Sequence, residues 1–352
     1  MKLKKLFTVG IAILLLVLLL AACGGNSEDT NDASGEGESS GDEANTEESV
    51  SFRLAHNQPE NHPIHLSLEE FTNLATEKSD GNIEIQIHPN GQLGAEREVI
   101  ESVKAGTLEM AKVSAGALEA FEESYKIFSL PYLFESEEHY YDVMDNSETV
   151  KEIYNSTEDD GFIAIGWYTS GQRSIYTVDQ KVETPDDMKG LKIRVQESPT
   201  SIAMIEAMGG SPTPMAFGDV YTSLQSGILD GAENNENALT QNNHGEVAKA
   251  YSYTEHQFVP DILIINSNTW NGLSDELKQA LIDAAEESKE SHKDRWAESI
   301  EEAKAAAEEM GVEFFEVDKQ AFIDAAAPLH DEFVSESDTN AKYFEDIKSF
   351  AQ

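Results

Sequence analysis

The sequence predicts an α/β fold, and three patterns carry this prediction. Between residues 51 and 113, short apolar strands alternate with amphipathic helices in a βαβαβ order, which is typical of a parallel sheet covered by helices. A second unit of strands begins at Ser174. One helical pattern then runs from Ser274 to Met310, with Ser274 as its N-cap. A chain of 352 residues has room for two domains of ordinary size.

The first unit is predicted from apolar alternation in its strands and from apolar residues at helical spacing in its helices. Its strands are expected at 51–55, 83–87, 108–113 and 161–167, and its helices at 64–78, 95–105 and 136–154.

The second unit begins with a strand at 174–178 and a strand at 191–195 that carries Arg194. A helix, a Gly-Pro turn, a second helix and an Asp-Gly turn then lead into Asn234 and Asn235. After these we expect helices at 244–254, 274–310, 319–334 and 339–350, and strands at 262–266 and 312–317.

The N-terminus predicts a lipid-anchored protein. A basic start, an apolar run and Leu-Ala-Ala-Cys identify residues 1–23 as a lipoprotein signal peptide, with Cys23 as the acylated residue. The alternative is an uncleaved membrane anchor. Several acyl chains on one residue give stable attachment. Residues 24–49 are polar and acidic, and are predicted to be a disordered tether.

The charge of the chain excludes one class of partner. With 67 acidic and 24 basic residues, the formal net charge of −43 would repel nucleic acid. A high-salt habitat and an ordinary solvated surface are two explanations of this acidity. A single cysteine excludes an intrachain disulfide. The sequence has no HExxH, paired CxxC, GxSxG, P-loop or GxGxxG motif, so we expect no metal, no cofactor and no enzyme activity.

The strongest candidate for a binding residue is Arg194, which lies in mid-strand between apolar neighbours in Leu-Lys-Ile-Arg-Val. A guanidinium fixed in a strand offers a planar fork of N–H groups that matches a carboxylate. The alternative, equally weighted on residue type alone, is a structural salt bridge to one of the many carboxylates.

Four stretches resemble the solute receptors of tripartite ATP-independent periplasmic (TRAP) transporters, the DctP family. They are DMKGLKIRV (187–195), GGSPTPMAFGDVYTSLQSGILDGAEN (209–234), QLGAEREVIESVKAGTLEMA (92–111) and SLPYLF (129–134). The resemblance implies two α/β domains of periplasmic-binding-protein type, a long helix spanning both and a ligand cleft between them. It places domain I at 50–172 plus about 259–298, and domain II at 173–258 plus about 299–352.

The resemblance also implies the site. Arg194 is expected to pair with a ligand carboxylate, Arg173 to assist it, Phe217 to lie against the ligand and Asn234 to donate to it. Positions in the first domain that vary with the ligand match His56, Asn57, Glu96 and Ser114.

One departure concerns the ligand class. Many relatives have Glu-Asn-Pro where this chain has Glu233-Asn234-Asn235, and this variant is closer to receptors of sugar acids such as hexuronates than to those of C4-dicarboxylates. Gln196, Asn234 and Asn235 would supply amide partners for extra hydroxyls. Trp167 and Tyr168 either stack on a sugar ring or belong to the core.

The expected function is therefore that of a monomeric receptor on the outer face of the cell membrane. It would bind a small organic acid and deliver it to a Na⁺-coupled TRAP membrane permease. Three alternatives remain: a ligand sensor for a membrane kinase, a secreted sugar-acid enzyme, and a receptor of an ATP-driven transporter.

Overall fold

The computed structural model describes residues 49–351. The predicted signal peptide with Cys23 and the predicted tether, apart from Ser49, lie outside the described residues.

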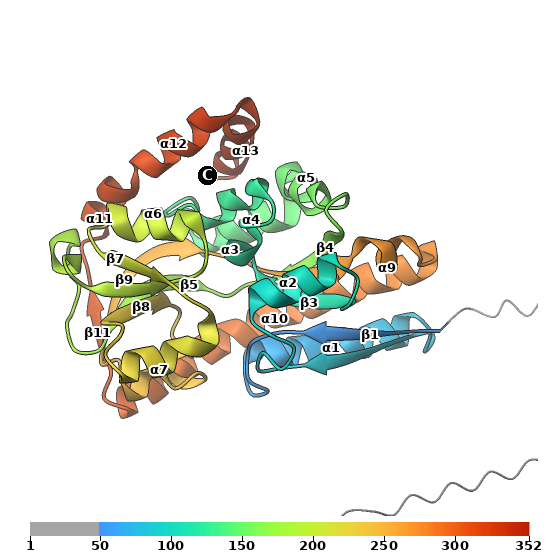
Figure 1. Cartoon of the computed structure of the whole chain (residues 1–352), viewed down its shortest axis with the longest axis horizontal. Coiled ribbons are helices and arrows are strands. Elements are labelled where there is room, and N and C mark those ends of the chain that lie inside the picture. Colours follow the sequence, from blue (N-terminus) through green and yellow to red (C-terminus); the bar gives the residue numbers. More distant parts are fainter. Residues whose placement is uncertain (1–48, 352) are drawn as a thin grey trace, which may run out of the picture. The chain divides into compact units, whose positions relative to one another are not determined.

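The first part of the fold is built on a mixed sheet of five strands (Figure 1). Its strand order is β2–β1–β3–β10–β4, with β1, β2 and β3 parallel to one another as the βαβαβ pattern predicts. The later strand β10 is antiparallel to both of its neighbours, so the sheet is not wholly parallel. The strands are β1 (Val50–Ala55), β2 (Ile83–His88), β3 (Met110–Ser114), β4 (Phe162–Tyr168) and β10 (Asp261–Asn266).

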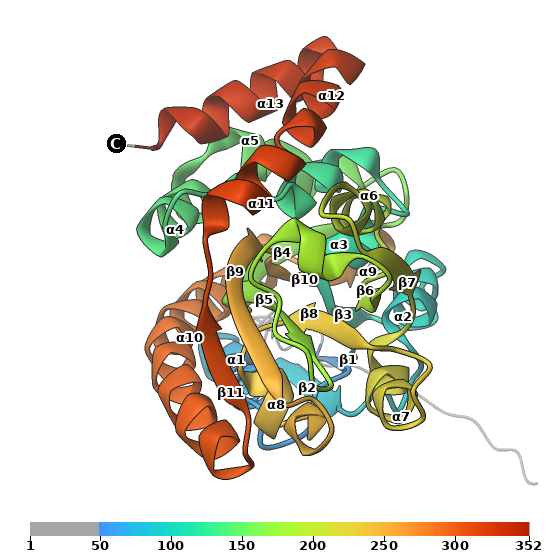
Figure 2. The same ribbon diagram turned by 90° about the vertical axis from the view of Figure 1, so that its left-hand side faces the viewer.

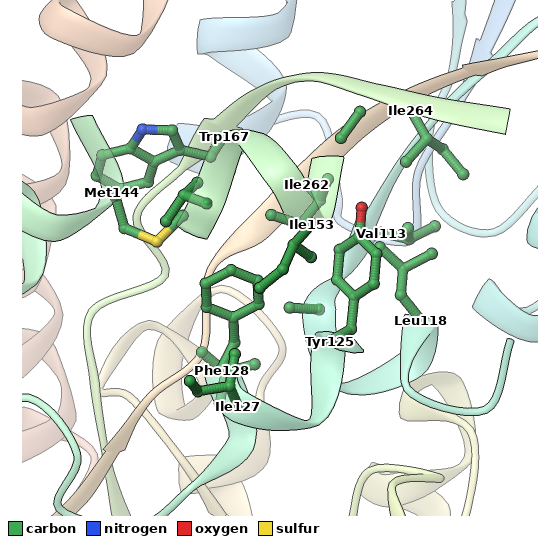
Figure 3. Close-up of a cluster of buried hydrophobic side chains, with 14 of the residues drawn as sticks. Val113, Leu118, Tyr125, Ile127, Phe128, Met144, Ile153, Trp167, Ile262 and Ile264 are labelled. Carbon is green, nitrogen blue, oxygen red and sulfur yellow. The ribbon is translucent and has the colours of Figure 1, made fainter. Parts of the chain in front are cut away.

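Helices cover both faces of this sheet, and the pleat of β10 shows how. Ile262 and Ile264 point into one core, which Figure 3 shows, while Leu263 and Ile265 point into the other. The core with Ile262 lies under α2 (Glu96–Lys104), α3 (Ala115–Leu118), η1 (Glu123–Ser129), α4 (Glu137–Asn146) and α5 (Glu148–Ser156). The core with Leu263 lies under α1 (Pro63–Lys78), α9 (Ser267–Asn271) and the first half of α10 (Asp275–Glu309).

A second sheet of six strands has the order β11–β9–β5–β8–β6–β7. Its edge strand β7 contains two prolines, which lack an N–H group and are tolerated only at such an edge. The strands are β5 (Gln172–Thr177), β6 (Lys192–Val195), β7 (Ser211–Pro214), β8 (Gly231–Asn234), β9 (Ala250–Phe258) and β11 (Glu313–Glu316).

Helices and turns also flank the second sheet. One core contains residues of η2 (Pro185–Met188), α6 (Pro199–Ala207) and α11 (Lys319–Ala326). The other contains residues of α7 (Val220–Gln225) and α8 (Asn237–Thr240), with the turns η3 (Phe217–Asp219) and η4 (His244–Glu246) beside it.

The long helix α10 contributes to a core of each sheet and so spans both, as expected. It has 35 residues, so it is about 50 Å long. Ser274 accepts a hydrogen bond from the Leu277 N–H and is its N-cap, as predicted. Residues from Leu277 to Trp296 pack into a core of the five-stranded sheet, whereas Ala307 packs into a core of the six-stranded sheet.

The last two helices were assigned to domain II in the predicted division, but most of their buried residues pack against the five-stranded sheet. The chain of α11, α12 (Pro328–Glu336) and α13 (Asp338–Ser349) leads back toward α4 and α5 (Figure 2). Phe333, Tyr343 and Ile347 join the core of the five-stranded sheet shown in Figure 3. Leu329 still packs against a core of the six-stranded sheet, whereas the residues from Phe333 on pack with the predicted domain I; the domain boundaries themselves stay a prediction.

Three predicted helices are wrong in detail. The helix expected at 136–154 is two helices, because the Ser147 side chain accepts hydrogen bonds from Thr149 N–H and Val150 N–H and starts α5. The helix at 319–334 ends at Ala326 and restarts at Pro328, which lacks an N–H group and is favoured in the first turn of a helix. The segment 244–254 holds a short turn and then β9, whose alternating side chains favour a strand.

Candidate functional site

A polar cavity of about 480 Å³, including its open mouth, lies between the two sheets. Both sheets and α10 contribute to its walls. The lining residues are Asn57, Gln58, His62, Glu96, Lys112, Ser114, Ser170, Arg173, Arg194, Gln196, Phe217, Asn234, Asn235, Ala238, Asn242, Asp261 and Trp296. An outer cavity shares Asn57, Glu96, Arg194, Gln196 and Phe217, so the site opens outward through it.

Nine of the ten ligand-binding residues predicted from the sequence line this cavity, although they come from distant segments. The tenth, His56, is buried beside it. Its Nδ1 accepts a hydrogen bond from Gln58 N–H, so its Nε2 carries the proton and donates to His65 Nδ1 at 3.0 Å. His56 therefore holds the loop that carries Asn57 and Gln58 in place.

Arg173, from β5, is already paired. Its Nε and one terminal nitrogen bind the two carboxylate oxygens of Glu233 at 2.5 and 2.9 Å, and both side chains are buried. The same guanidinium donates to the Glu233 carbonyl and to Asn234 Oδ1. Of its five N–H groups, one is left for a ligand. Burial raises the pKa of Glu233, but Arg173 and His256 outweigh this effect and lower it to about 2.

Arg194, from β6, is buried to the same extent but has no carboxylate partner among residues 49–351. Its Nε and one terminal N–H donate to the Met215 carbonyl at 3.0 and 2.9 Å. Three of its five N–H groups are therefore uncommitted. The Phe217 ring lies 5.5 Å from the guanidinium carbon. Burial lowers the pKa of Arg194, as expected for a cation that lacks an ion-pair partner.

The two asparagines that follow Glu233 differ in what they can offer. Asn234 Oδ1 accepts from Arg173 and from Asn235, while its own amide N–H groups make no hydrogen bond to the described part of the chain. Asn235 donates to the Ser170 carbonyl and to Asn234, and its Oδ1 accepts from Asn237 N–H. Asn234 thus has free donors, whereas the side-chain amide of Asn235 is engaged in holding the loop.

The wall supplied by the five-stranded sheet is charged. Lys112, in mid-strand in β3 and only 1% exposed, lies 3.2 Å from Asp261 and 4.0 Å from Glu96, and donates to Asn57. Ser114 N–H donates to Glu96 Oε1 at 3.0 Å. Burial raises the pKa of Glu96, which Lys112 only partly opposes.

Direct hydrogen bonds also cross the cleft. Gln196, at the end of β6, donates to Ser114 Oγ at 2.8 Å. Asn242 donates to Gln58 Oε1 at 3.1 Å. The two walls therefore meet through polar groups, which exchange partners at lower cost than a packed apolar interface.

Trp167 and Tyr168 belong to the core. The Trp167 indole N–H donates to Asp145, and the Tyr168 hydroxyl pairs with Ser288. Both are buried, and neither lines the cavity. The aromatic wall is instead Phe217 and Trp296, the latter from α10.

The residues that sequence reasoning missed are of two kinds. Lys112 shows the same pattern that identified Arg194, a single basic residue between apolar neighbours in a strand, and was recognisable in Met-Ala-Lys-Val-Ser. Asp261 and Trp296 reach the cavity only through the pairing of β10 with β3 and the path of α10, which no local pattern reveals.

Residues 49–351 contain no group of three or more His, Cys, Asp or Glu side chains arranged to hold a metal ion. The same residues contain no helix with the length and apolarity needed to cross a membrane.

Residues 54–337 match the family model of bacterial extracellular solute-binding protein, family 7 (DctP). The chain is 43% identical to YiiZ of Salmonella typhimurium over 80% of this chain and 86% of that protein. A TRAP periplasmic solute-binding protein of Anaerococcus prevotii, solved with D-glucuronate, superposes with a TM-score of 0.83 at 43% identity, covering 86% of this chain and 98% of that one. One from Sulfitobacter, solved with β-D-galacturonate, gives 0.82 at 31%, covering 85% and 100%.

These matches confirm the resemblance seen in the four sequence motifs, and with it the two-domain periplasmic-binding-protein fold. The family and its solved members are extracytoplasmic binding proteins. The chain belongs to the DctP family, the solute-binding proteins of TRAP transporters.

Proposed function

We propose that this receptor binds a hexuronate, with the carboxylate on Arg194, and delivers it to a Na⁺-coupled TRAP permease. The observation that carries the proposal is the free guanidinium. A buried cation without a counter-ion is unfavourable, and a ligand carboxylate would supply the missing charge together with two parallel hydrogen bonds. Arg194 has the uncommitted N–H groups that this requires.

The sugar-acid class is favoured over C4-dicarboxylates by the rest of the cavity. Asn234 offers amide donors, and Asn57 and Gln58 line the opposite wall. Such groups match hydroxyls. The relatives solved with D-glucuronate and β-D-galacturonate support the same class.

We propose that ligand binding favours the closed form of the cleft. A ligand held by Arg194 and by Asn57 contacts both walls at once, so its affinity is greater when the walls are together. The polar contacts between Gln196 and Ser114, and between Asn242 and Gln58, would form as the cleft closes.

We propose that the mature protein is a monomer. We also propose that acyl chains on Cys23, which lies outside the described residues, attach it to the outer face of the cell membrane. The small residues before this cysteine, the only one in the chain, support the anchor.

The test is a calorimetric titration of the wild-type protein and Arg194→Ala with D-glucuronate, D-galacturonate and succinate. We expect the wild type to bind a uronate more tightly than succinate. Loss of two charge-assisted hydrogen bonds, about 1.5–3 kcal/mol each, predicts at least about a 100-fold loss of uronate affinity in Arg194→Ala. Thermal unfolding without ligand should change only modestly, because no ion pair is broken and the loss is confined to the two hydrogen bonds to the Met215 carbonyl.

Arg97→Ala is the matched control. Arg97 is an exposed arginine on α2 that pairs with Glu101 and lies outside the cavity. Its removal should leave the titration unchanged. Equal uronate affinity in Arg194→Ala and Arg97→Ala would refute the assignment of Arg194.

A further inference from the structure

The cavity carries an uneven distribution of charge. Arg173 and Glu233 neutralise each other as a bidentate pair, so the charge of the six-stranded side is that of Arg194. On the other side, one cation, Lys112, is shared by two carboxylates, Glu96 and Asp261. We call these three residues the acidic wall, because they leave one negative charge in excess.

The pairing of β3 with β10 determines where the residues of the acidic wall lie. Lys112 and Ser114 lie on the same face of β3, because Val113 between them points into the core. Asp261 is paired directly with Ser114 across the antiparallel β10. Glu96, at the start of α2, approaches the same point and accepts from Ser114 N–H. Three separate elements therefore fix the two carboxylates against one edge of the cavity.

Each carboxylate keeps an oxygen available. Glu96 Oε1 accepts from Ser114, and Asp261 Oδ2 faces Lys112. The other oxygen of each takes no hydrogen bond from any residue between 49 and 351. A free carboxylate oxygen accepts from a hydroxyl, but it has no donor to offer to another carboxylate.

We propose that the acidic wall limits the ligand to a single carboxylate. Glu96 and Asp261 accept hydrogen bonds from the hydroxyls of a sugar acid whose carboxylate lies on Arg194, and they disfavour a second carboxylate at that end. The receptor therefore discriminates uronates from aldarates, the sugar acids with a carboxylate at each end. This inference rests on the proposed function.

The electrostatics support a large effect. A second ligand carboxylate would lie within several ångströms of two like charges in a cleft that excludes much of the solvent. Lys112 cannot offset this repulsion, since it already faces Asp261 and Glu96. At the effective dielectric of such sites, one uncompensated like charge lowers affinity by roughly 10- to 100-fold. The raised pKa of Glu96, due first to burial and also to Asp261, agrees with incomplete neutralisation by Lys112.

The experiment compares D-glucuronate with D-glucarate by calorimetric titration of the full chain near pH 7. D-Gluconate is added as a probe that differs from D-glucarate only in having a hydroxymethyl group in place of one carboxylate. We expect wild-type protein to bind D-glucuronate at least about tenfold more tightly than D-glucarate. Glu96→Gln and Asp261→Asn, which remove a charge at nearly constant volume, should each reduce this ratio about tenfold.

Glu101→Gln is the matched control, because Glu101 is an exposed residue of the same helix as Glu96 and lies outside the cavity. It should leave the ratio unchanged. The far-UV circular dichroism spectrum and thermal unfolding of each variant show whether it has folded. If one variant has not folded, the inference is tested by the ratio of D-glucuronate to D-glucarate affinity in the wild-type protein and in the other variant.

The outcomes separate this inference from the proposed function. If neither uronate binds the wild-type protein, the proposed function fails and the inference fails with it. If a uronate binds but D-glucarate binds equally well, only the inference is overturned. An unchanged ratio in both folded variants overturns it as well, even if wild-type protein prefers D-glucuronate.

Discussion

Replacing Glu233 by Gln should destabilise the protein while sparing ligand binding. Glu233 is fully buried and forms two hydrogen bonds with the Arg173 guanidinium, at 2.5 and 2.9 Å. His256, also buried, lies 3.5 Å from the same carboxylate. Glutamine keeps the shape but removes the charge, so Arg173 becomes a buried cation without a counter-ion.

The pKa of Glu233 gives the magnitude. A shift from 4.5 to about 2 corresponds to roughly 3 kcal/mol, at 1.36 kcal/mol per unit. Breaking a buried ion pair by removing one partner costs about 3–5 kcal/mol, which agrees. For a folded part of about 300 residues, a loss of about 3 kcal/mol predicts a decrease in the melting temperature of roughly 5 °C.

The assay is urea unfolding of wild-type protein and Glu233→Gln at neutral pH, followed by titration with a uronate. Because the folded pKa of Glu233 is lowered, its contribution is complete above pH 4.5 and is lost as the pH falls from 4.5 toward 2. The difference between the two proteins should therefore shrink below pH 4.5. Uronate affinity should not fall, because Arg194 is untouched and Arg173, which lines the same cavity, gains an unpaired positive charge.

Glu236→Gln is the control for this substitution. Glu236 is also buried and lies three residues away, but burial raises its pKa, so its charge is unfavourable in the folded state. The control should be neutral or slightly stabilising. If Glu233→Gln were as stable as Glu236→Gln, the ion pair would contribute nothing and the distinction between the two arginines would fail.

Two further predictions concern other parts of the chain. His292 accepts from Ser67 at Nδ1 and donates to the Thr169 carbonyl from Nε2, and burial lowers its pKa to about 4. The contribution of neutral His292 to the free energy of unfolding is complete above pH 6.5 and is lost as the pH falls from 6.5 to 4. In urea unfolding, the wild-type protein should therefore lose about 2 kcal/mol more stability than His292→Gln when the pH is lowered from 7 to 5. An equal pH dependence in the two proteins would contradict this. Cys23→Ser should move the protein from the membrane fraction to the soluble fraction of cells, and continued sedimentation with the membranes would exclude the proposed acyl anchor.

Much of the fold could be predicted from local patterns. The first three strands, α1 and the ends of α10 follow from apolar spacing and from capping residues such as Ser274, which act over a few residues. The first part of β9 was instead predicted as the end of a helix at 244–254. Its conformation depends on pairing with β5 and β11, which are distant in the sequence.

The sequence predicted which residues line the cavity better than it predicted which of their polar groups are free to bind a ligand. The family resemblance, together with the chemistry of Arg194 and the amide side chains, identified nine lining residues, but hydrogen-bond partners decide which groups are free. Asn235 was expected to donate to a ligand, yet both its amide hydrogens are taken by Ser170 and Asn234. Such competition between partners within a few ångströms is settled by packing, and no spacing in the sequence encodes it.

The two arginines show most clearly why the partner matters. The pairing of β5 with β8 sets Ile175 opposite Glu233 and brings the carboxylate to Arg173. On β6, the neighbour that reaches Arg194 is a backbone carbonyl, which satisfies N–H groups without supplying charge. In a chain with 67 acidic residues, a buried guanidinium without a carboxylate is unexpected by composition alone. The charge of Arg194 is thus available to an anionic ligand, because Glu233 on the neighbouring strand β8 is already bound by Arg173.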